Sequence, residues 1–252
     1  MPEGLEAEIY ARSARKVIGR RVIAVEVDPL CGDGDQLGTL IGGEVTGVRR
    51  HGKHVLVDTN RGALGMHFGM TGRLVVDGAA AIEQLEYGAR RDDPSWDRLI
   101  VRFDEGEMRV NDPRRFSRHR LDPVLDLGVD LLAPVGMIAA ALDGVARRRG
   151  PVKGVLLDQR VIAGLGNLCV DEVLFHAGVD PATPMREVTD RDRLAKVIAE
   201  TMPSMLAAGG SHTGDTGPGH REGDGRCARD GTPLVRSMVA GRATVACPMH
   251  QR

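Results

Sequence analysis

The sequence predicts an α+β fold: a helix and an antiparallel β-sandwich come first, followed by a helical domain and a terminal β-hairpin of the zinc-ribbon type. Short runs that alternate apolar and polar residues occupy much of the stretch between residues 21 and 103. Apolar residues at helical spacing dominate residues 134–208 instead. Two C-x-x motifs flank a Gly-containing turn near the C-terminus, a spacing that is typical of zinc ribbons.

These patterns divide the chain into consecutive parts. We expect the N-terminal sandwich at residues 1–120, a linker at 121–133, the helical domain at 134–208, a mobile loop at 209–224 and the terminal hairpin at 225–252.

The composition narrows the classes of function. With 252 residues, 42% of them hydrophobic, the chain can form one large domain or two small ones with packed cores. A formal net charge of −1 gives no overall basic field, although arginines cluster at residues 109–120 and again at 226–252. No apolar run reaches membrane-spanning length and no signal-peptide core is present, so we expect a cytoplasmic protein. Its four cysteines then favour a metal site over disulfides.

The first element is an amphipathic helix that we expect to begin at Glu3. Leu5 and Ile9 lie on its apolar side, and Glu3 and Glu6 lie in the first turn, where the helix dipole favours acids. A proline before a helix and acidic residues at its start are ordinary helix chemistry. This structural explanation requires no catalysis.

The same residues allow an interpretation in which the chain end is a nucleophile. Removal of Met1, which is efficient before a small proline, leaves Pro2 with a free secondary amine. An α-amine titrates near pH ~8, so much of it is neutral at physiological pH. Its attack on the anomeric carbon of a sugar would give an iminium ion, and Glu3 could protonate the ring oxygen as a general acid.

The β-rich region contains strands expected at residues 21–27, 44–50, 54–58 and 98–103, of which the second and third form a hairpin. Lys53 lies at the tip of that hairpin. Residues 67–74 end a strand with two glycines, and Asn111-Asp-Pro-Arg-Arg-Phe116 forms a turn. An exposed lysine, a core methionine at Met70 and an Asp-Pro turn explain these features structurally.

The helical domain contains helices expected at residues 137–149 and 190–208, with a helical hairpin from Lys153 to Pro181 between them. Its two apolar faces are separated by Gly164-Leu-Gly-Asn167, where the glycines favour a sharp turn and Asn167 can cap the second helix. The open helix N-terminus then forms an anion site suited to a nucleic-acid phosphate. An ordinary hairpin with a Gly-rich turn is the alternative.

The terminal hairpin carries the candidate metal ligands. Cys227-Ala-Arg-Asp230 and Cys247-Pro-Met-His250 lie on either side of a turn at Gly241. Zinc binds cysteine and histidine commonly and aspartate less often. We interpret these four residues as a structural zinc site, and a metal-free, degenerate ribbon is the alternative.

In this order, the motifs resemble those of the formamidopyrimidine-DNA glycosylase and endonuclease VIII family, and the resemblance covers nearly the whole chain. It rests on the Pro2-Glu3 start, on the LLDQ and AGLGN segments of the long hairpin, which resemble the family's helix-two-turn-helix, and on Gly241-Arg-Ala-Thr in the terminal hairpin. This hairpin, residues 225–252, resembles the family's zinc finger, and we call it the finger. Leu5 stands where the family usually has proline. Asp230 and His250 stand where it usually has cysteine.

The resemblance implies a role for each position. The implied catalytic residues are Pro2, Glu3, Glu6 and Lys53. The implied phosphate contacts are Lys53, His67, Asn167 and Arg242, with Lys153 as a further DNA-binding residue. Met70, Arg114 and Phe116 would fill the gap that a flipped nucleotide leaves, and residues 209–224 would close over the flipped base.

We therefore expect a monomeric, nucleoid-associated DNA glycosylase and AP lyase of base excision repair that acts on damaged double-stranded DNA. The alternatives are a DNA-binding protein that senses damage without catalysis and, more distantly, a ribosome-associated protein that uses the helical motif on RNA. The Pro-Glu-Gly start is typical of the branch that acts on oxidised pyrimidines. Residues 67–70 and the Gly-Gly-Ser loop are typical of the oxidised-purine branch, so both classes of base stay open.

Overall fold

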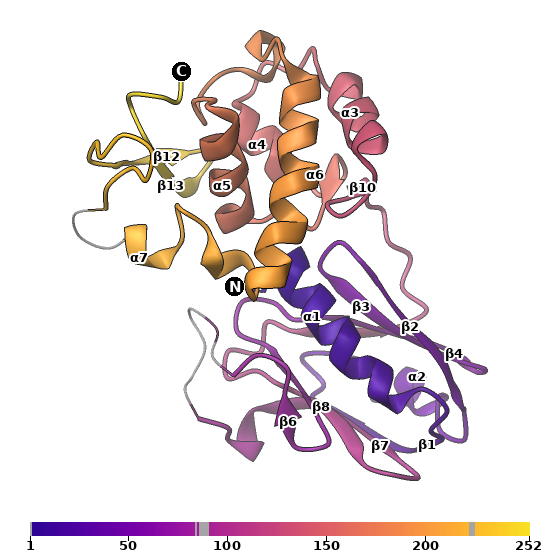
Figure 1. Cartoon of the computed structure of the whole chain (residues 1–252). Coiled ribbons are helices and arrows are strands. Elements are labelled where there is room, and N and C mark those ends of the chain that lie inside the picture. The colour runs from indigo at the N-terminus through magenta and orange to yellow at the C-terminus, as the bar shows by residue number, and fades with distance from the viewer. Residues whose placement is uncertain (1, 84, 86–90, 222–224) are drawn as a thin grey trace. The chain divides into compact units, whose positions relative to one another are not determined.

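The computed structural model describes residues 2–83, 85, 91–221 and 225–252. The chain divides into two compact units, Met1–Leu125 and Asp126–Arg252 (Figure 1). The division falls inside the expected linker at residues 121–133. No helix among the described residues is long and apolar enough to cross a membrane.

The first unit is the expected antiparallel β-sandwich with a helix at its start. Among its described residues, one sheet has the order β1-β7-β8-β5-β6 and the other β2-β3-β4-β9, and the pairings within both are antiparallel. The strands are β1 Val22–Val27, β2 Val45–His51, β3 His54–Thr59, β4 Gly62–His67, β5 Arg73–Val76, β6 Ala79–Ala80, β7 Asp97–Phe103, β8 Glu107–Asn111 and β9 Arg118–Leu121. The helical segments are α1 Gly4–Ala14, η1 Arg15–Val17, α2 Gly34–Gly38 and η2 Pro94–Trp96.

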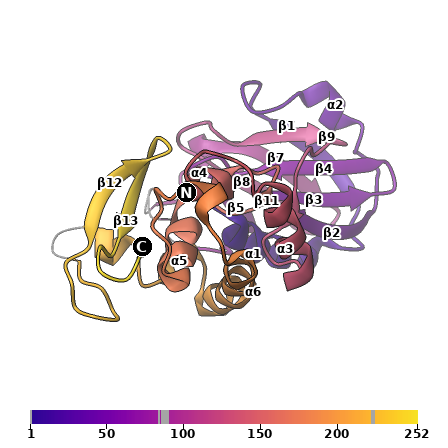
Figure 2. The ribbon, with the colours of Figure 1, turned by 90° about the horizontal axis from the view of Figure 1, so that it is seen from above.

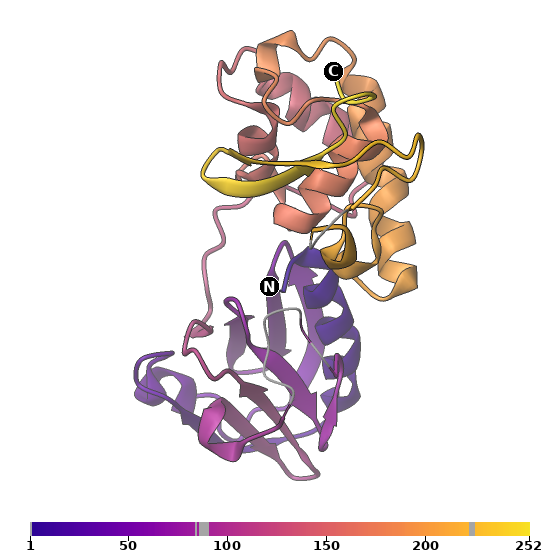
Figure 3. The same ribbon diagram turned by 90° about the vertical axis from the view of Figure 1, so that its left-hand side faces the viewer.

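The core of this unit lies between the sheets and beneath α1, which runs along the sandwich and packs against β2 and β3 (Figure 3). Tyr10 of α1 is fully buried against Phe68, with the ring centroids 4.5 Å apart. Met66 and Leu99 are also fully buried. Each large apolar side chain buried in this way contributes roughly 1.5–3 kcal/mol, so the core fixes the position of α1 and of the residues at its start.

The second unit is helical and ends in a β-hairpin. Its elements are β10 Val129–Asp130, α3 Val135–Gly144, α4 Val152–Leu157, β11 Ile162–Ala163, α5 Asn167–Ala177, η3 Met185–Glu187, α6 Arg191–Ala208, η4 Ser211–Thr213, α7 Pro218–Arg221, β12 Val235–Val239 and β13 Arg242–Ala246. β10 and β11 pair in parallel, whereas β12 and β13 form the antiparallel hairpin. Figure 2 shows this hairpin beside α5, against which β13 packs.

Two sequence expectations differ from the structure in this unit. α3 ends at Gly144 rather than at Arg149. The stretch expected to be a loop contains η4 and α7. The Glu172 carboxylate on α5 accepts hydrogen bonds from the backbone N–H groups of Asp215 (2.9 Å) and Thr216 (2.8 Å) within it. A glycine-rich composition does not reveal a buried anchor elsewhere in the chain. The last residues of that expected loop, 222–224, lie outside the described residues.

Candidate active site and nucleic-acid interface

The N-terminal pair of acids forms a capping box at the start of α1. Glu3 is the N-cap residue, its side chain accepts from the backbone of Glu6, and the Glu6 carboxylate accepts from the Glu3 backbone N–H at 2.7 Å. Glu3 and Glu6 are 1% and 4% exposed. The partial positive charge of the helix start favours both carboxylates. Glu3 is therefore held rigidly directly after Pro2, which is itself buried.

A second cluster surrounds the tip of the β2–β3 hairpin, where Gly52 and Lys53 make the turn. His54 and His67 are partners on β3 and β4, with ring centroids 5.0 Å apart. Burial, together with the charges of His54, Lys53 and Arg118, lowers the pKa of His67 to about 4. The ring is thus neutral at physiological pH. Its Nδ1 accepts from the Gly69 N–H at 3.2 Å, so Nε2 carries the proton and can donate to an anion.

Met70, Arg114 and Phe116, which we call the wedge, lie on two adjacent turns of the first unit. The Arg114 guanidinium stacks over the Phe116 ring at 4.7 Å. Phe116 is 43% exposed. Gly69 packs so closely on the second turn that a Cβ there would lie 2.5 Å from the Phe116 carbonyl carbon. The structure therefore packs the turn that carries Met70 against the turn that carries Arg114 and Phe116, and it leaves an aromatic ring partly exposed.

In the second unit, the turn between α4 and α5 is organised by Gln159. Its side chain donates to the carbonyls of Leu157 (3.0 Å) and Leu165 (2.8 Å) and accepts from Gly164 N–H at 2.9 Å. The expected capping role of Asn167 is wrong, because the N-cap residue of α5 is Gly166, and Asn167 is the first residue of the helix itself. The Asn167 side chain instead donates to the Ala243 carbonyl at 2.9 Å.

Lys153 occupies a different place from the one expected. It is 0% exposed, and its ammonium group donates to Asp171 at 2.6 Å, to Thr244 Oγ1 at 2.8 Å and to the Ala243 carbonyl at 3.1 Å. Such burial argues against a direct contact with a phosphate. The lysine joins α4 and α5 to β13, which begins with Arg242, so its contribution to that surface is structural.

The terminal hairpin brings the four predicted metal ligands together. The candidate ligand atoms of Cys227, Asp230, Cys247 and His250 all lie within 4.8 Å of one another. Cys227 Sγ is 3.4 Å from His250 Nδ1, and Cys247 Sγ is 3.4 Å from Asp230 Oδ2. This Cys₂-Asp-His group can bind a metal ion.

The surroundings of His250 fit a metal ligand. Its Nε2 lies 3.1 Å from the Phe175 carbonyl oxygen, which can only accept, so the ring proton is on Nε2. The Nδ1 lone pair then faces the sulfur and carboxylate atoms, and a carbonyl that fixes the tautomer is the usual partner of a ligating histidine. The four candidate ligand atoms thus bring their lone pairs together, as in the coordination site of a cation such as Zn²⁺.

Two family models match this chain. The formamidopyrimidine-DNA glycosylase N-terminal domain matches residues 1–119, and the formamidopyrimidine-DNA glycosylase H2TH domain matches residues 127–216. The chain belongs to the formamidopyrimidine-DNA glycosylase family. The resemblance drawn from the motifs is confirmed, as is the fold class.

Individual members of the family are similar over most or all of their length. The formamidopyrimidine-DNA glycosylase of Paracoccus denitrificans is 32% identical, with 100% of both chains covered. That of Geobacillus kaustophilus is 33% identical over 84% of this chain and 83% of its own. Among solved structures, Lactococcus lactis Fpg bound to DNA with an abasic site has a TM-score of 0.81 at 25% identity over 99% of both chains. MutM with carbocyclic 8-oxo-G DNA has a TM-score of 0.80 at 26% identity, with 100% of both chains covered.

Motif reasoning missed the buried acids that hold these surfaces in place. Asp112 is 0% exposed beneath the wedge, and Asp171 and Glu172 are 0% and 2% exposed on α5. The Asp-Pro dipeptide signalled a turn at Asp112 but not the partners of its carboxylate. For Asp171 and Glu172 the sequence carried no signal, because most of their partners, such as Lys153 for Asp171 and Thr216 for Glu172, lie far along the chain.

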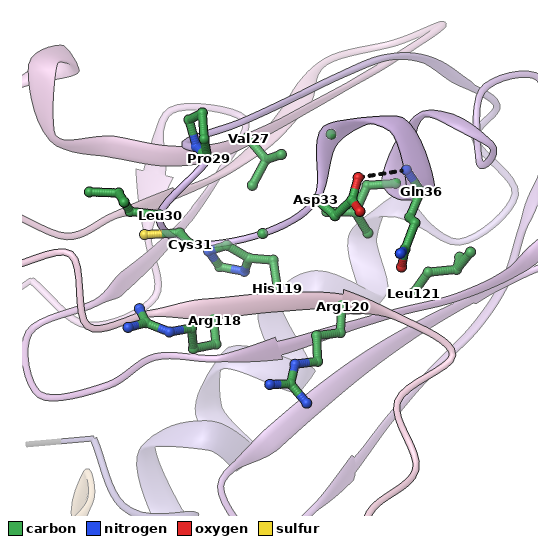
Figure 4. Close-up of a pocket in the computed structure, with 13 residues that line it drawn as sticks. Val27, Pro29, Leu30, Cys31, Asp33, Gln36, Arg118, His119, Arg120 and Leu121 are labelled. Atoms are coloured by element: carbon green, nitrogen blue, oxygen red, sulfur yellow. Dashed lines mark hydrogen bonds between the residues drawn. The ribbon is translucent and has the colours of Figure 1, made fainter.

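Away from the family motifs, a hollow of about 660 Å³ lies between the 29–37 segment and β9. Figure 4 shows His119 beside Cys31 there, with Arg118 and Arg120 extending from the same strand. His119 is 1% exposed, and neither of its ring nitrogens has a hydrogen-bond partner among the described residues. Burial lowers the pKa of His119 to about 3. Cys31 is a buried free thiol.

His119 should therefore make the protein sensitive to acid. Its folded-state pKa lies below the unfolded value near 6.5, so the unfolded state binds more protons, and stability is lost as the pH falls from that value towards 3. We expect His119→Met to remove this loss, which amounts to about 1.4 kcal/mol per pH unit. Urea unfolding of both proteins between pH 7 and 4 measures the difference. If the free energy of unfolding depended on pH in the same way in both proteins, His119 would not be the cause of the acid sensitivity. The contribution of His67 cancels in this comparison because both proteins retain it.

Proposed function

We propose that this DNA glycosylase of base excision repair is bifunctional and removes a damaged base through a covalent bond to Pro2. The Pro2 nitrogen, freed by removal of Met1, forms a bond to C1′ of the damaged nucleotide, and the glycosidic C–N bond breaks as the base leaves. Glu3 protonates the deoxyribose ring oxygen, so the ring opens to an iminium ion. This ion has no N–H proton to lose and stays cationic.

The positive nitrogen then drives strand cleavage. Loss of a C2′ proton lets the C3′–O bond break and releases the 3′ phosphate. Loss of a C4′ proton then lets the C5′–O bond break and releases the 5′ phosphate. Water finally hydrolyses the iminium and restores the Pro2 amine. Support for this sequence comes from the capping box, which fixes the Glu3 carboxylate next to Pro2 at the helix start.

The proposed DNA contacts are made by residues that the family motifs identify. Lys53 and the Nε2–H of His67 bind phosphates in the first unit, and Asn167 and Arg242 do so in the second. Extrusion of a nucleotide costs a few kcal/mol of stacking and pairing, and the wedge fills the gap that it leaves. Zn²⁺ held by the Cys₂-Asp-His group would fix the finger that carries Arg242. The chain acts as a monomer, because these roles all fall on residues of one copy.

The substrate class that we favour is an oxidised or ring-opened purine in duplex DNA. The matching family models describe formamidopyrimidine-DNA glycosylases, and the structurally similar proteins include one in complex with carbocyclic 8-oxo-G DNA. Single-lesion duplexes that carry an oxidised purine, an oxidised pyrimidine or an abasic site distinguish these preferences.

The observation that carries the proposal is the Glu3 carboxylate fixed beside the chain end, and borohydride trapping tests it. Reduction during turnover should leave a stable protein–DNA adduct whose attachment site is Pro2. Pro2→Gly should lower its yield strongly, since a glycine imine, unlike a proline iminium, can lose its proton. No adduct with wild type, together with full activity of Pro2→Gly, would contradict the mechanism. DNA binding without any nicking would favour the rival function of a catalytically silent damage sensor.

A further inference from the structure

The wedge lies on two separate turns, one between β4 and β5 and one between β8 and β9. Met70 belongs to the first turn, and Arg114 and Phe116 belong to the second. Exposed turns with an aromatic ring and a long arginine are flexible unless something holds their backbone. Both turns here are held by a single side chain.

That side chain is the buried carboxylate of Asp112. Oδ2 accepts from the backbone N–H groups of Phe116 at 2.7 Å and Ser117 at 2.8 Å, and Oδ1 accepts from that of Arg114 at 3.1 Å. Oδ1 also accepts a short hydrogen bond from the hydroxyl of Thr71, the residue after Met70. The carboxylate thus ties the second turn to itself and also ties it to the first.

Two further contacts hold the backbone in the same arrangement. Gly69 has φ +58, and a side chain there would overlap the backbone of Phe116. Arg115 also has a positive φ, +56, and its guanidinium bonds Asp28 at 3.0 Å. A non-glycine residue keeps such a backbone only where its surroundings enforce it, and the Asp112 hydrogen bonds on both sides of Arg115 do so.

We propose that Asp112 is a positioning residue that holds Met70, Arg114 and Phe116 as one rigid wedge before DNA is met. The inference rests on the proposed function and deepens it. With the turns ordered on folding, insertion into the duplex costs little conformational entropy, and three side chains reach the gap together. Asp112 itself touches neither the base nor the sugar.

The proposal predicts a split between two activities of Asp112→Asn. The amide has one acceptor oxygen where the carboxylate has two. In either orientation its NH2 group faces a backbone N–H of the second turn, that of Arg114 or those of Phe116 and Ser117, from which it cannot accept a hydrogen bond, so this turn loosens. Excision of a damaged base from duplex DNA should fall about 10- to 100-fold in kcat. Cleavage of a preformed abasic site in single-stranded DNA, where no stack has to be filled, should stay within about twofold of wild type. Fluorescence of 2-aminopurine placed opposite the lesion reports insertion of the wedge into the duplex. On binding of the variant it should change less than on binding of wild type.

Two matched variants keep the test decisive. Thr71→Val breaks only the link between the turns and should reproduce the split more weakly, which covers the case in which Asp112→Asn does not fold. Asp33→Asn replaces a similar aspartate that caps α2 and should leave both activities unchanged. Equal duplex excision by wild type, Asp112→Asn and Thr71→Val would overturn the inference, as would a proportional loss of both activities. A wild type without either activity would instead contradict the proposed function.

Discussion

Glu3→Gln should slow excision of a damaged base by about 10²- to 10⁴-fold, the usual contribution of a general acid. The glutamine keeps a side-chain oxygen that can accept the Glu6 N–H, so the capping box and the start of α1 should survive. What the variant loses is the proton that the deoxyribose ring oxygen needs when the sugar opens. Single-turnover excision from a lesion duplex measures this loss separately from DNA binding, which we expect to change little.

The control for this experiment is Glu105→Gln, which removes the same charge from an exposed turn of the same unit. It should excise at the wild-type rate. Glu6→Ala separates catalysis from capping, because Glu6 accepts from the Glu3 backbone N–H and alanine has no acceptor. It should reduce the free energy of unfolding by ~1 kcal/mol and affect the rate only through the position of Glu3. If Glu3→Gln kept full activity, Glu3 would be a capping residue alone.

The sequence was informative wherever a periodic pattern reflects one buried face. The β2–β3 hairpin and β7 lie within a residue or two of their expected bounds. In β7 the buried residues Leu99, Val101 and Phe103 alternate with partly buried ones, which is the pattern that the sequence shows. α6 ends at Ala208 as expected, followed by a glycine in the left-handed region. α3 is shorter than expected. The arginines after Gly144 fit a helix in the sequence, but they are exposed and bury no face against the core.

Site residues could be predicted only where the chemistry of a motif requires a particular type of residue. The four candidate ligands of the terminal hairpin lie together, and the two turns that carry the wedge residues pack on each other. Lys153 shows why the remainder was not predictable. The family resemblance implied a DNA-binding role for it, but its partners Asp171 and Thr244 lie 18 and 91 residues away in the sequence. Pairing over such distances leaves no local pattern.

Loss of the metal ion from the finger is the second change from which we expect a large effect, on folding of the hairpin and on DNA binding. Structural zinc contributes on the order of 10 kcal/mol to the folding of zinc-finger peptides, and the small hairpin β12–β13 buries only a few apolar residues of its own. We expect about one zinc ion per chain by metal analysis and none in Cys247→Ser. Without the metal, Arg242 is no longer held against the phosphates. The slope of log K for DNA binding against the logarithm of the salt concentration should therefore decrease in magnitude by about one.

The departure of this finger from four cysteines makes the metal assignment testable in both directions. Asp230→Cys supplies a thiolate that zinc prefers to a carboxylate, and we expect it to bind zinc more tightly at unchanged DNA affinity. His250→Phe removes a ligand and also the Nε2 hydrogen bond to Phe175, so it should lose the metal. Cys31→Ser, a buried thiol outside the finger, controls for general damage and should retain zinc. A metal-free wild type whose DNA affinity and salt dependence match those of Cys247→Ser would show that this hairpin folds on packing alone.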